Sequence, residues 1–202
     1  MKQLVIIGAS GHGRVAADIA AKSGYDSIVF LDDNGAVQSC GGYPVMGESA
    51  RFIEYECDFF VAIGNPQVRQ RIHEKLLRAG KRVATLIHPF TAIAEDVTIG
   101  IGSLVAAGAV VNPGAVVGSG CIINTCASVD HDCVIADFVH VAVGAHVAGT
   151  VRIGERTRVG AGAVVSNNLT ICGACVIGAG AVVIRSIAES GTYVGVPAEK
   201  IK

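Results

Sequence analysis

Aromatic and charged side chains are scarce in this sequence. Its 202 residues contain no Trp, 5% are aromatic and 16% are charged, whereas 51% are hydrophobic. The core must therefore be built mainly from Val, Ile and Ala, which suits a narrow architecture. The formal net charge of −1 creates no general field that would attract nucleic acid, so we expect no nucleic-acid partner.

Long hydrophobic runs and an export signal are also lacking. The apolar opening from Leu4 to Ile7 is too short for the core of a signal peptide, and turn signals interrupt every longer apolar stretch. We therefore expect a soluble, cytoplasmic protein without membrane insertion. Its seven cysteines are an odd number, which favours reduced thiols.

One CxxC motif, Cys172 and Cys175, raises the question of a metal or redox role. No second pair accompanies it, and Cys175 falls at a position where the chain repeatedly places a small inward side chain. We therefore expect these thiols to serve packing and expect no metal site.

The abundant feature is a period of six residues. Residues 87–188 divide into 17 such units without insertion or deletion, and the fifth residue of a unit is mostly small, as at Ala109 and Cys121. This period excludes an α-helix, whose faces recur every 3.6 residues, and is typical of a parallel β-helix. Each unit opens with Ile or Val: Ile87, Ile93, Ile99, Val105, Val111, Val117, Ile123, Val129, Ile135, Val141, Val147, Ile153, Val159, Val165, Ile171, Ile177 and Val183.

Glycines gather at the second and fourth positions of the units. Gly100 and Gly118 are examples of the second position, and Gly102 and Gly108 of the fourth. They flank the place where a tight corner would lie, and glycine relieves the backbone strain of such a bend. With three units to a coil, we expect between five and six coils stacked into a column of roughly 25 Å.

The amino-terminal part lacks this period and alternates strand and helix signals. An apolar run at residues 2–7 ends in a glycine-rich turn from Gly8 to Gly13, and a helical pattern follows. Such a turn lets the backbone approach a phosphate while the helix N-terminus faces its charge. A second strand at residues 27–31 is followed by Asp32 and Asp33, where a nucleotide-binding βαβ unit places an acid on its ligand.

Two further strands complete a small parallel α/β domain. Residues 58–63 lead into Gly64, a helix follows, and residues 82–86 supply the last strand. We expect this domain to span residues 1–86, and the column with its carboxyl-terminal cap to span 87–202. A ligand should bind at the glycine turn, the end of the second strand and Gly64.

Two other interpretations of the glycine turn stay open. A dinucleotide-binding dehydrogenase would carry GxGxxG, but the spacing here is GxxGxG and the domain has room for only one mononucleotide-binding half. The glycines can also serve a tight turn without any ligand.

Several segments together resemble a known family, the bacterial nucleotide-sugar acetyltransferases of the left-handed β-helix superfamily. The resemblance is closest to the UDP-4-amino-sugar N-acetyltransferases of the bacillosamine pathway and covers nearly the whole chain. It rests on the hexapeptide column together with Gly8-Ala-Ser-Gly-His-Gly13, Phe30-Leu-Asp-Asp33, Asp58-Phe-Phe-Val-Ala-Ile-Gly-Asn65 and Asp130-His-Asp-Cys-Val-Ile135.

This resemblance implies a Rossmann-like α/β domain followed by a left-handed parallel β-helix, assembled as a homotrimer with acetyl-CoA between adjacent columns. His131 matches the general base, Asp132 stands where the closest relatives carry Glu, and Gly149 matches a backbone oxyanion donor. The nucleotide sugar is expected at Ser10, Gly11, His12, Asp32, Asp33 and Gly64, and the cosubstrate at His140, Ala161 and Ala179.

The expected chemistry suits these residue types. A sugar amine attacks a thioester only as the free amine, and an imidazole that titrates near neutrality can remove its proton. A neighbouring carboxylate can fix the ring tautomer. Gly149 lies one full coil after His131 at the same position of its unit, so its N–H can lie beside the base.

We therefore expect acetyl transfer from acetyl-CoA to the amine of a UDP-linked 4-amino-4,6-dideoxy sugar. A GDP-perosamine N-acetyltransferase and a sialic acid O-acetyltransferase are alternatives, because an acidic residue alone does not distinguish UDP from GDP. A trimeric nucleotide-binding scaffold without activity is the non-enzymatic alternative.

Overall fold

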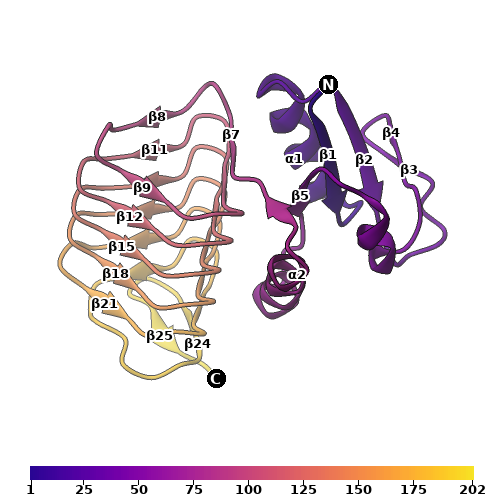
Figure 1. Ribbon diagram of the computed structural model, residues 1–202. Helices are drawn as coiled ribbons and strands as arrows, with labels where there is room; N and C mark the ends of the chain where they lie inside the picture. Colours follow the sequence, from indigo (N-terminus) through magenta and orange to yellow (C-terminus); the bar gives the residue numbers. More distant parts are fainter. The chain divides into compact units, whose positions relative to one another are not determined.

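A computed structural model describes residues 1–202 and divides them into two compact units, residues 1–89 and 90–202. The first is an α/β unit, and the second is a column of stacked coils (Figure 1). This arrangement confirms the expected fold class. Ile87, the first opener of the period, belongs by its contacts to the first unit.

The first unit is built on a four-stranded parallel sheet in the order β2-β1-β5-β6. Its central strands are almost fully buried, as the apolar runs predict. The sheet strands are β1 (Gln3–Ile7), β2 (Ser27–Leu31), β5 (Asp58–Val61) and β6 (Arg82–Val83).

Two helices follow the sheet strands. The helix α1 (Gly11–Lys22) buries Ala16, Ile19 and Ala20, and α2 (Pro66–Arg78) begins where the Asn65 side chain accepts a hydrogen bond of 3.0 Å from the Val68 N–H. Neither helix is long and apolar enough to cross a membrane. The remaining elements are the hairpin β3 (Ser39–Cys40) and β4 (Tyr43–Pro44), the 3-10 helix η1 (Ser49–Glu54) and β7 (Leu86–Ile87).

The second unit repeats a two-residue strand every six residues. Three parallel sheets result, each joining strands that are three units apart in sequence. The strands are β8 (Ala92–Ile93), β9 (Thr98–Ile99), β10 (Leu104–Val105), β11 (Val110–Val111), β12 (Val116–Val117), β13 (Ile122–Ile123), β14 (Ser128–Val129), β15 (Val134–Ile135), β16 (His140–Val141), β17 (His146–Val147), β18 (Arg152–Ile153), β19 (Arg158–Val159), β20 (Val164–Val165), β21 (Thr170–Ile171), β22 (Val176–Ile177) and β23 (Val182–Val183).

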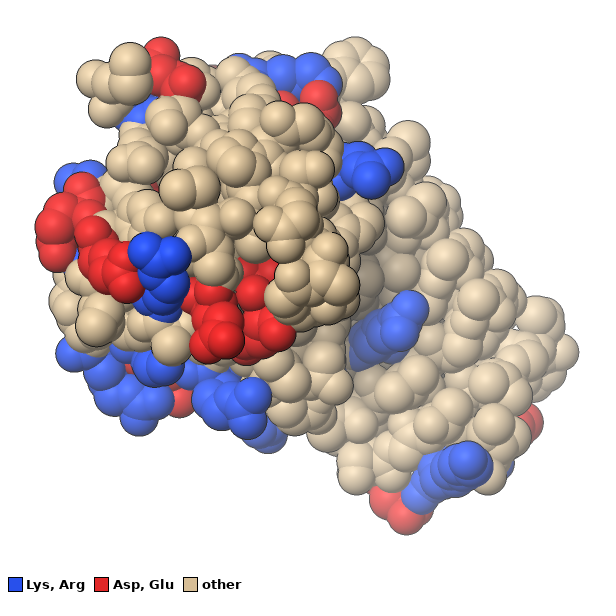
Figure 2. Space-filling view, turned by 90° about the vertical axis from the view of Figure 1, so that its right-hand side faces the viewer, with Lys and Arg blue, Asp and Glu red and all other residues tan.

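The unit openers and the small fifth residues form the core of the column. Openers from Val105 to Val183 are at most 2% exposed, and small residues such as Ala127 and Cys133 are fully buried between them. Where the fifth residue is polar and fully buried, its side chain is hydrogen-bonded: Ser103 donates to the Gly118 carbonyl at 2.8 Å and accepts from the Cys121 N–H at 2.9 Å. The surface of the coils is largely uncharged in one view (Figure 2).

The fourth residue of a unit forms the expected corner. From Gly102 to Gly180, the residue at the fourth position of each unit has a positive φ, between 55° and 73°. Half of these residues are not glycine. The glycines at the second position have another cause. A Cβ on Gly100 would lie 2.5 Å from the Gly118 carbonyl carbon of the next coil, so stacking itself leaves no room for a side chain there.

The carboxyl-terminal segment leaves the period of six but extends one sheet. The strand β24 (Thr192–Val194) pairs in parallel with β22, and β25 (Glu199–Lys200) returns antiparallel to β24. Tyr193 and Ala198 pack against the end of the apolar core, which agrees with a capping role.

The buried first residues of the units are the positions at which a shorter side chain should destabilise the column most. Ile135→Ala should lower the free energy of unfolding by about 2–5 kcal/mol, because Ile135 is 1% exposed and the stacked coils leave a cavity unfilled. Ile101→Ala removes the same atoms from a side chain that is 48% exposed and should change stability by less than about 0.5 kcal/mol. Urea unfolding of both variants measures the difference, and equal losses would contradict this account of the core.

Candidate functional site

An imidazole and a carboxylate meet at one corner of the column, between β14 and β15. The Nδ1 atom of His131 lies 2.8 Å from Oδ2 of Asp132, and both side chains are more than half exposed. Asp132 is a fourth-position residue with a φ of 57°. Asp adopts this left-handed conformation more readily than most residues, and it turns the carboxylate back onto the preceding ring.

The pairing sets the tautomer and the basicity of the imidazole. A carboxylate only accepts hydrogen bonds, so Nδ1 carries the proton and the Nε2 lone pair is left free. The hydrogen bond to Asp132 raises the pKa of His131, and the negative charges of Asp130 and Asp132 add to the effect. Asp132 thus holds the ring in one orientation and leaves Nε2 able to accept a proton.

Two glycines on the adjacent coils make room for this pair. A Cβ on Gly149, one coil after His131, would lie 2.4 Å from His131 Nε2, and a Cβ on Gly114, one coil before Asp132, would lie 2.6 Å from Asp132 Oδ1. Nε2 therefore rests directly against the Gly149 backbone. The Gly149 N–H donates no hydrogen bond within the chain, whereas the N–H of His131 at the same position of its unit does.

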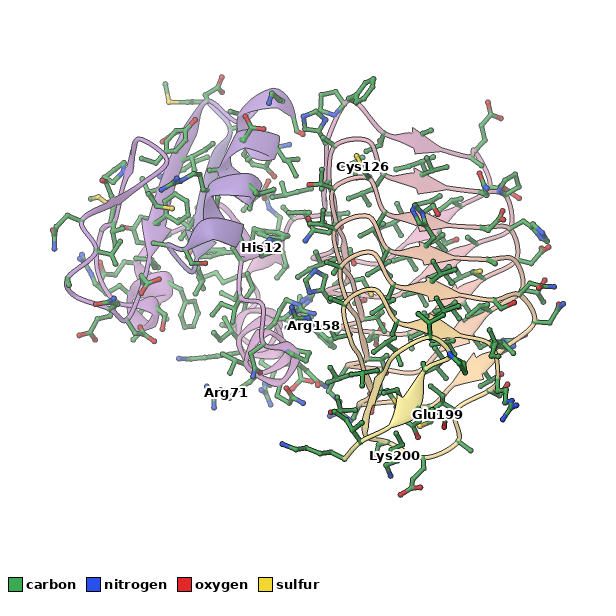
Figure 3. The ribbon with its side chains drawn as sticks, turned by 180° about the vertical axis from the view of Figure 1, so that it is seen from behind. His12, Arg71, Cys126, Arg158, Glu199 and Lys200 are labelled. Carbon is green, nitrogen blue, oxygen red and sulfur yellow. The ribbon has the colours of Figure 1, made fainter.

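His140 lies apart from this corner, on the outward face of β16. Its Nε2 is 3.1 Å from the side-chain nitrogen of Asn124, and it stands directly beside Arg158 in the ladder between β16 and β19. Arg158 projects outward from the column (Figure 3). His140, Asn124 and Arg158 thus form a polar row on one sheet.

Ala161 and Ala179 occupy a third place, the corner after that sheet. Both are exposed, and the Gly180 N–H donates to the Ala161 carbonyl at 2.8 Å, so the two alanines stack in consecutive coils. Within one chain, this small-residue corner and the His131 corner are different corners of the column. The structure therefore does not bring the expected base and the expected cosubstrate-lining residues together in a single copy.

The expected nucleotide turn has the close packing that its glycines predict. A Cβ on Gly13 would lie 2.1 Å from the Gly8 carbonyl oxygen, and one on Gly8 would lie 2.8 Å from the Ala62 carbonyl oxygen. Gly11 has open space around it, and Ser10 is the N-cap of α1 without a hydrogen bond from its side chain. Gly8 and Gly13 are thus required by packing, while Ser10 and Gly11 face outward at the helix N-terminus.

The two acids after β2 hold the chain around this turn. Asp32 Oδ2 accepts a hydrogen bond of 2.6 Å from the Ala9 N–H, and Asp33 Oδ1 accepts one of 2.7 Å from the Ser49 N–H. The bonds from Ser49 lower the pKa of Asp33. Both carboxylates already have backbone partners, so a ligand would use their remaining lone pairs.

His12 and Gly64 lie near a buried arginine that the sequence did not single out. Arg69 on α2 is 1% exposed and donates to the carbonyls of Ile63 and Gly64 at 2.8 and 3.1 Å. Burial, followed by the charge of Arg69, lowers the pKa of His12 to about 4. His12, near the start of α1 (Figure 3), is therefore neutral at pH 7, and its buried Nε2 has no partner.

The CxxC thiols are adjacent, with their Sγ atoms 3.4 Å apart. Cys175 is fully buried in the column core, and burial raises the pKa of its thiol to about 11. A protonated, buried thiol packs as a small apolar side chain, in agreement with the packing interpretation.

Comparison with known proteins gives the family. The PglD N-terminal domain family matches residues 3–76. GDP-perosamine N-acetyltransferase of Escherichia coli O157:H7 is 33% identical over 164 residues, which cover 77% of this chain and 74% of that protein. UDP-N-acetylbacillosamine N-acetyltransferase of Bacillus subtilis (strain 168) is 36% identical over 113 residues, which cover 53% of this chain and 52% of that protein.

The likeness extends to solved structures. The acetyltransferase domain of PglB from Neisseria gonorrhoeae FA1090, in complex with acetyl coenzyme A, is 41% identical and superposes with a TM-score of 0.96 over 99% of both chains. The cosubstrate is therefore acetyl-CoA, and the chain is an enzyme. It belongs to the nucleotide-sugar N-acetyltransferases of the hexapeptide-repeat β-helix superfamily.

Proposed function

We propose that this enzyme acetylates the amine of a UDP-linked 4-amino-4,6-dideoxy sugar with His131 as the general base. The observation that carries the proposal is the His131–Asp132 pair, with Nδ1 held at 2.8 Å and Nε2 placed against the backbone of Gly149. His146, another imidazole of the column, contacts the Ser128 hydroxyl instead of a carboxylate.

The reaction can be written with these groups alone. The sugar nitrogen attacks the thioester carbonyl while His131 Nε2 removes a proton from that nitrogen. The oxyanion that forms accepts a hydrogen bond from the Gly149 N–H. As the oxyanion collapses, the C–S bond breaks, and the imidazolium returns the proton to the CoA sulfur. Asp132 stabilises the transient positive charge on the ring throughout.

Removal of the imidazole should slow the chemical step. His131→Ala is expected to lower kcat by ~10²–10⁴-fold, because general-base catalysis contributes about that much to the rate. The affinity for the nucleotide sugar should change little. His146→Ala is the matched control, since that exposed imidazole contacts Ser128 and no carboxylate. A thiol-release assay measures both variants, and ordinary turnover by His131→Ala at neutral pH would contradict the assignment.

The acceptor sugar can be linked to UDP or to GDP. The two relatives are named for a GDP-linked and a UDP-linked sugar. The motifs from Gly8 to Gly13 and from Phe30 to Asp33 favour UDP by resemblance. GDP-perosamine is the second candidate, because the relative named for it matches the larger share of this chain.

A panel of acceptors separates the candidates. We expect thiol release from acetyl-CoA with UDP-linked 4-amino sugars and much less with GDP-perosamine or free sialic acid. Asp33→Ala should raise the KM of the acceptor more than it lowers kcat, because contacts remote from the amine are largely uniform binding. Preference for GDP-perosamine would redirect the proposal to that sugar, and turnover of sialic acid alone would refute N-acetylation.

We further propose that the enzyme is a cyclic homotrimer whose site is shared between subunits. His131 and the Ala161–Ala179 corner lie at different corners of one column, and the imidazole is open to solvent in a single chain. Exposed outward valines, among them Val116 and Val143, give the column apolar surface that a second copy can cover.

A complementation experiment tests the shared site. His131→Ala supplies an intact cosubstrate corner, and Ala161→Trp supplies an intact base. Random hybrid trimers would contain one complete site in most assemblies, so a co-expressed mixture should recover about a quarter of the wild-type activity. A mixture as inactive as its components would place the site within one chain, and sedimentation showing only monomer at micromolar concentration would contradict the trimer.

A further inference from the structure

A second carboxylate, that of Asp130, contacts the main chain of His131. Asp130 Oδ1 accepts a hydrogen bond of 2.8 Å from the main-chain N–H of His131. The peptide that carries the imidazole is therefore fixed by a side chain. By contrast, the backbone N–H of Gly149, at the same position one coil later, has no partner within the chain.

Asp130 is itself held from the coil before. The Asn112 side-chain nitrogen donates to the same Oδ1 atom at 2.7 Å, across the ladder between β11 and β14. Asn112 and Asp130 occupy the second position of their units, 18 residues apart, where most units carry Gly or Ala. The bonds from Asn112 and from the His131 N–H both lower the pKa of Asp130, so its carboxylate is negative at neutral pH.

Few charged groups lie near the His131 imidazole. Asp130 and Asp132 are the acidic groups that act on His131. The corner of the preceding coil, residues 112–114, and that of the following coil, residues 148–150, contain no charged residue. Asp132 acts on the ring through Nδ1, whereas Asp130 acts on the main chain and through space.

We propose that Asp130, anchored by Asn112, is a positioning residue for this acetyl transfer, which sets the His131 backbone so that Nε2 meets the sugar amine. This inference rests on the proposed role of His131. In this role Asp130 acts through the His131 main chain and not on the reacting atoms. Its two effects are separable, because one requires only a hydrogen-bond acceptor and the other requires a negative charge.

Two substitutions at Asp130 separate these effects. Asp130→Asn keeps an acceptor for the His131 N–H and removes the charge, so plateau kcat should stay within about threefold of wild type. Asp130→Ala removes both and should lower plateau kcat by ~10–100-fold, because a small displacement of a catalytic group has a cost of that order. In both variants the KM of the nucleotide sugar should change less than about threefold.

The pH profile gives a readout that a merely structural role would not move. His131 must be neutral to accept a proton, so activity is lost as the pH falls through its raised pKa. Removal of the Asp130 charge lowers that pKa, and the acidic limb of kcat/KM for Asp130→Asn should therefore shift to lower pH. An unchanged acidic limb would overturn the electrostatic part of the proposal.

Asn112 should act only through Asp130. Asn112→Ala is expected to lower kcat less than Asp130→Ala does, and the double variant should be no slower than Asp130→Ala alone. Additive losses would contradict this dependence.

The matched control is Asp137→Ala. Asp137 Oδ1 accepts from the Ser119 N–H at 2.7 Å, which is the same kind of bond at another corner. Its loss should lower the melting temperature and leave kcat and the pH profile unchanged. Equal kinetic losses in Asp137→Ala, or a folded Asp130→Ala with wild-type kcat, would overturn the proposal. Turnover by His131→Ala is a separate result that would refute the base itself, and Asp130→Asn keeps the test decisive if Asp130→Ala does not fold.

Discussion

The stacking of coils by parallel backbone hydrogen bonds is the constraint on which the column depends. Each strand has only two residues, so no strand is stable without the equivalent strand 18 residues away, as in the pairing of Val111 with Val129. This ladder puts openers over openers and corners over corners. A functional group at a corner therefore meets residues at the same position of neighbouring coils, which explains how His131 meets Gly149 and how Asp132 meets Gly114.

Corner geometry also determines which acid can serve the base. Asp132 has a φ of 57°, and a short side chain in this conformation folds back to reach His131 Nδ1 at 2.8 Å. A longer carboxylate would have to take a different path over Gly114, whose missing Cβ leaves space for the Asp132 oxygen. Asp at this position is thus compatible with an oriented imidazole.

The sequence predicted the column because its period is rigid, and it predicted the sheet of the first unit because each strand is an apolar run. The hairpin of β3 and β4 was missed, since four paired residues carry no alternation that a pattern search can detect. The burial of Arg69 was missed because a charged residue on a helix is usually solvated.

Contacts between coils were the harder part of the site. Asn112 and Asp130 share a position of the repeat, but only the register of the ladder shows that their side chains meet. Two polar side chains at a position usually held by small residues were the available signal. The roles of Ser10, Gly11, His12, Asp32, Asp33, Gly64, His131, Asp132, His140, Gly149, Ala161 and Ala179 stay predictions, because ligand contacts decide them.

The register of 18 residues also limits how this chain can change in length. A single inserted residue between His131 and Gly149 would rotate every later opener out of the core and turn the glycine away from the imidazole. Insertion of a whole coil after Gly149 keeps each corner above its counterpart, so the column can lengthen without a change in the site. Length variation along this half of the chain is therefore confined to whole coils or to loops that bulge from a corner.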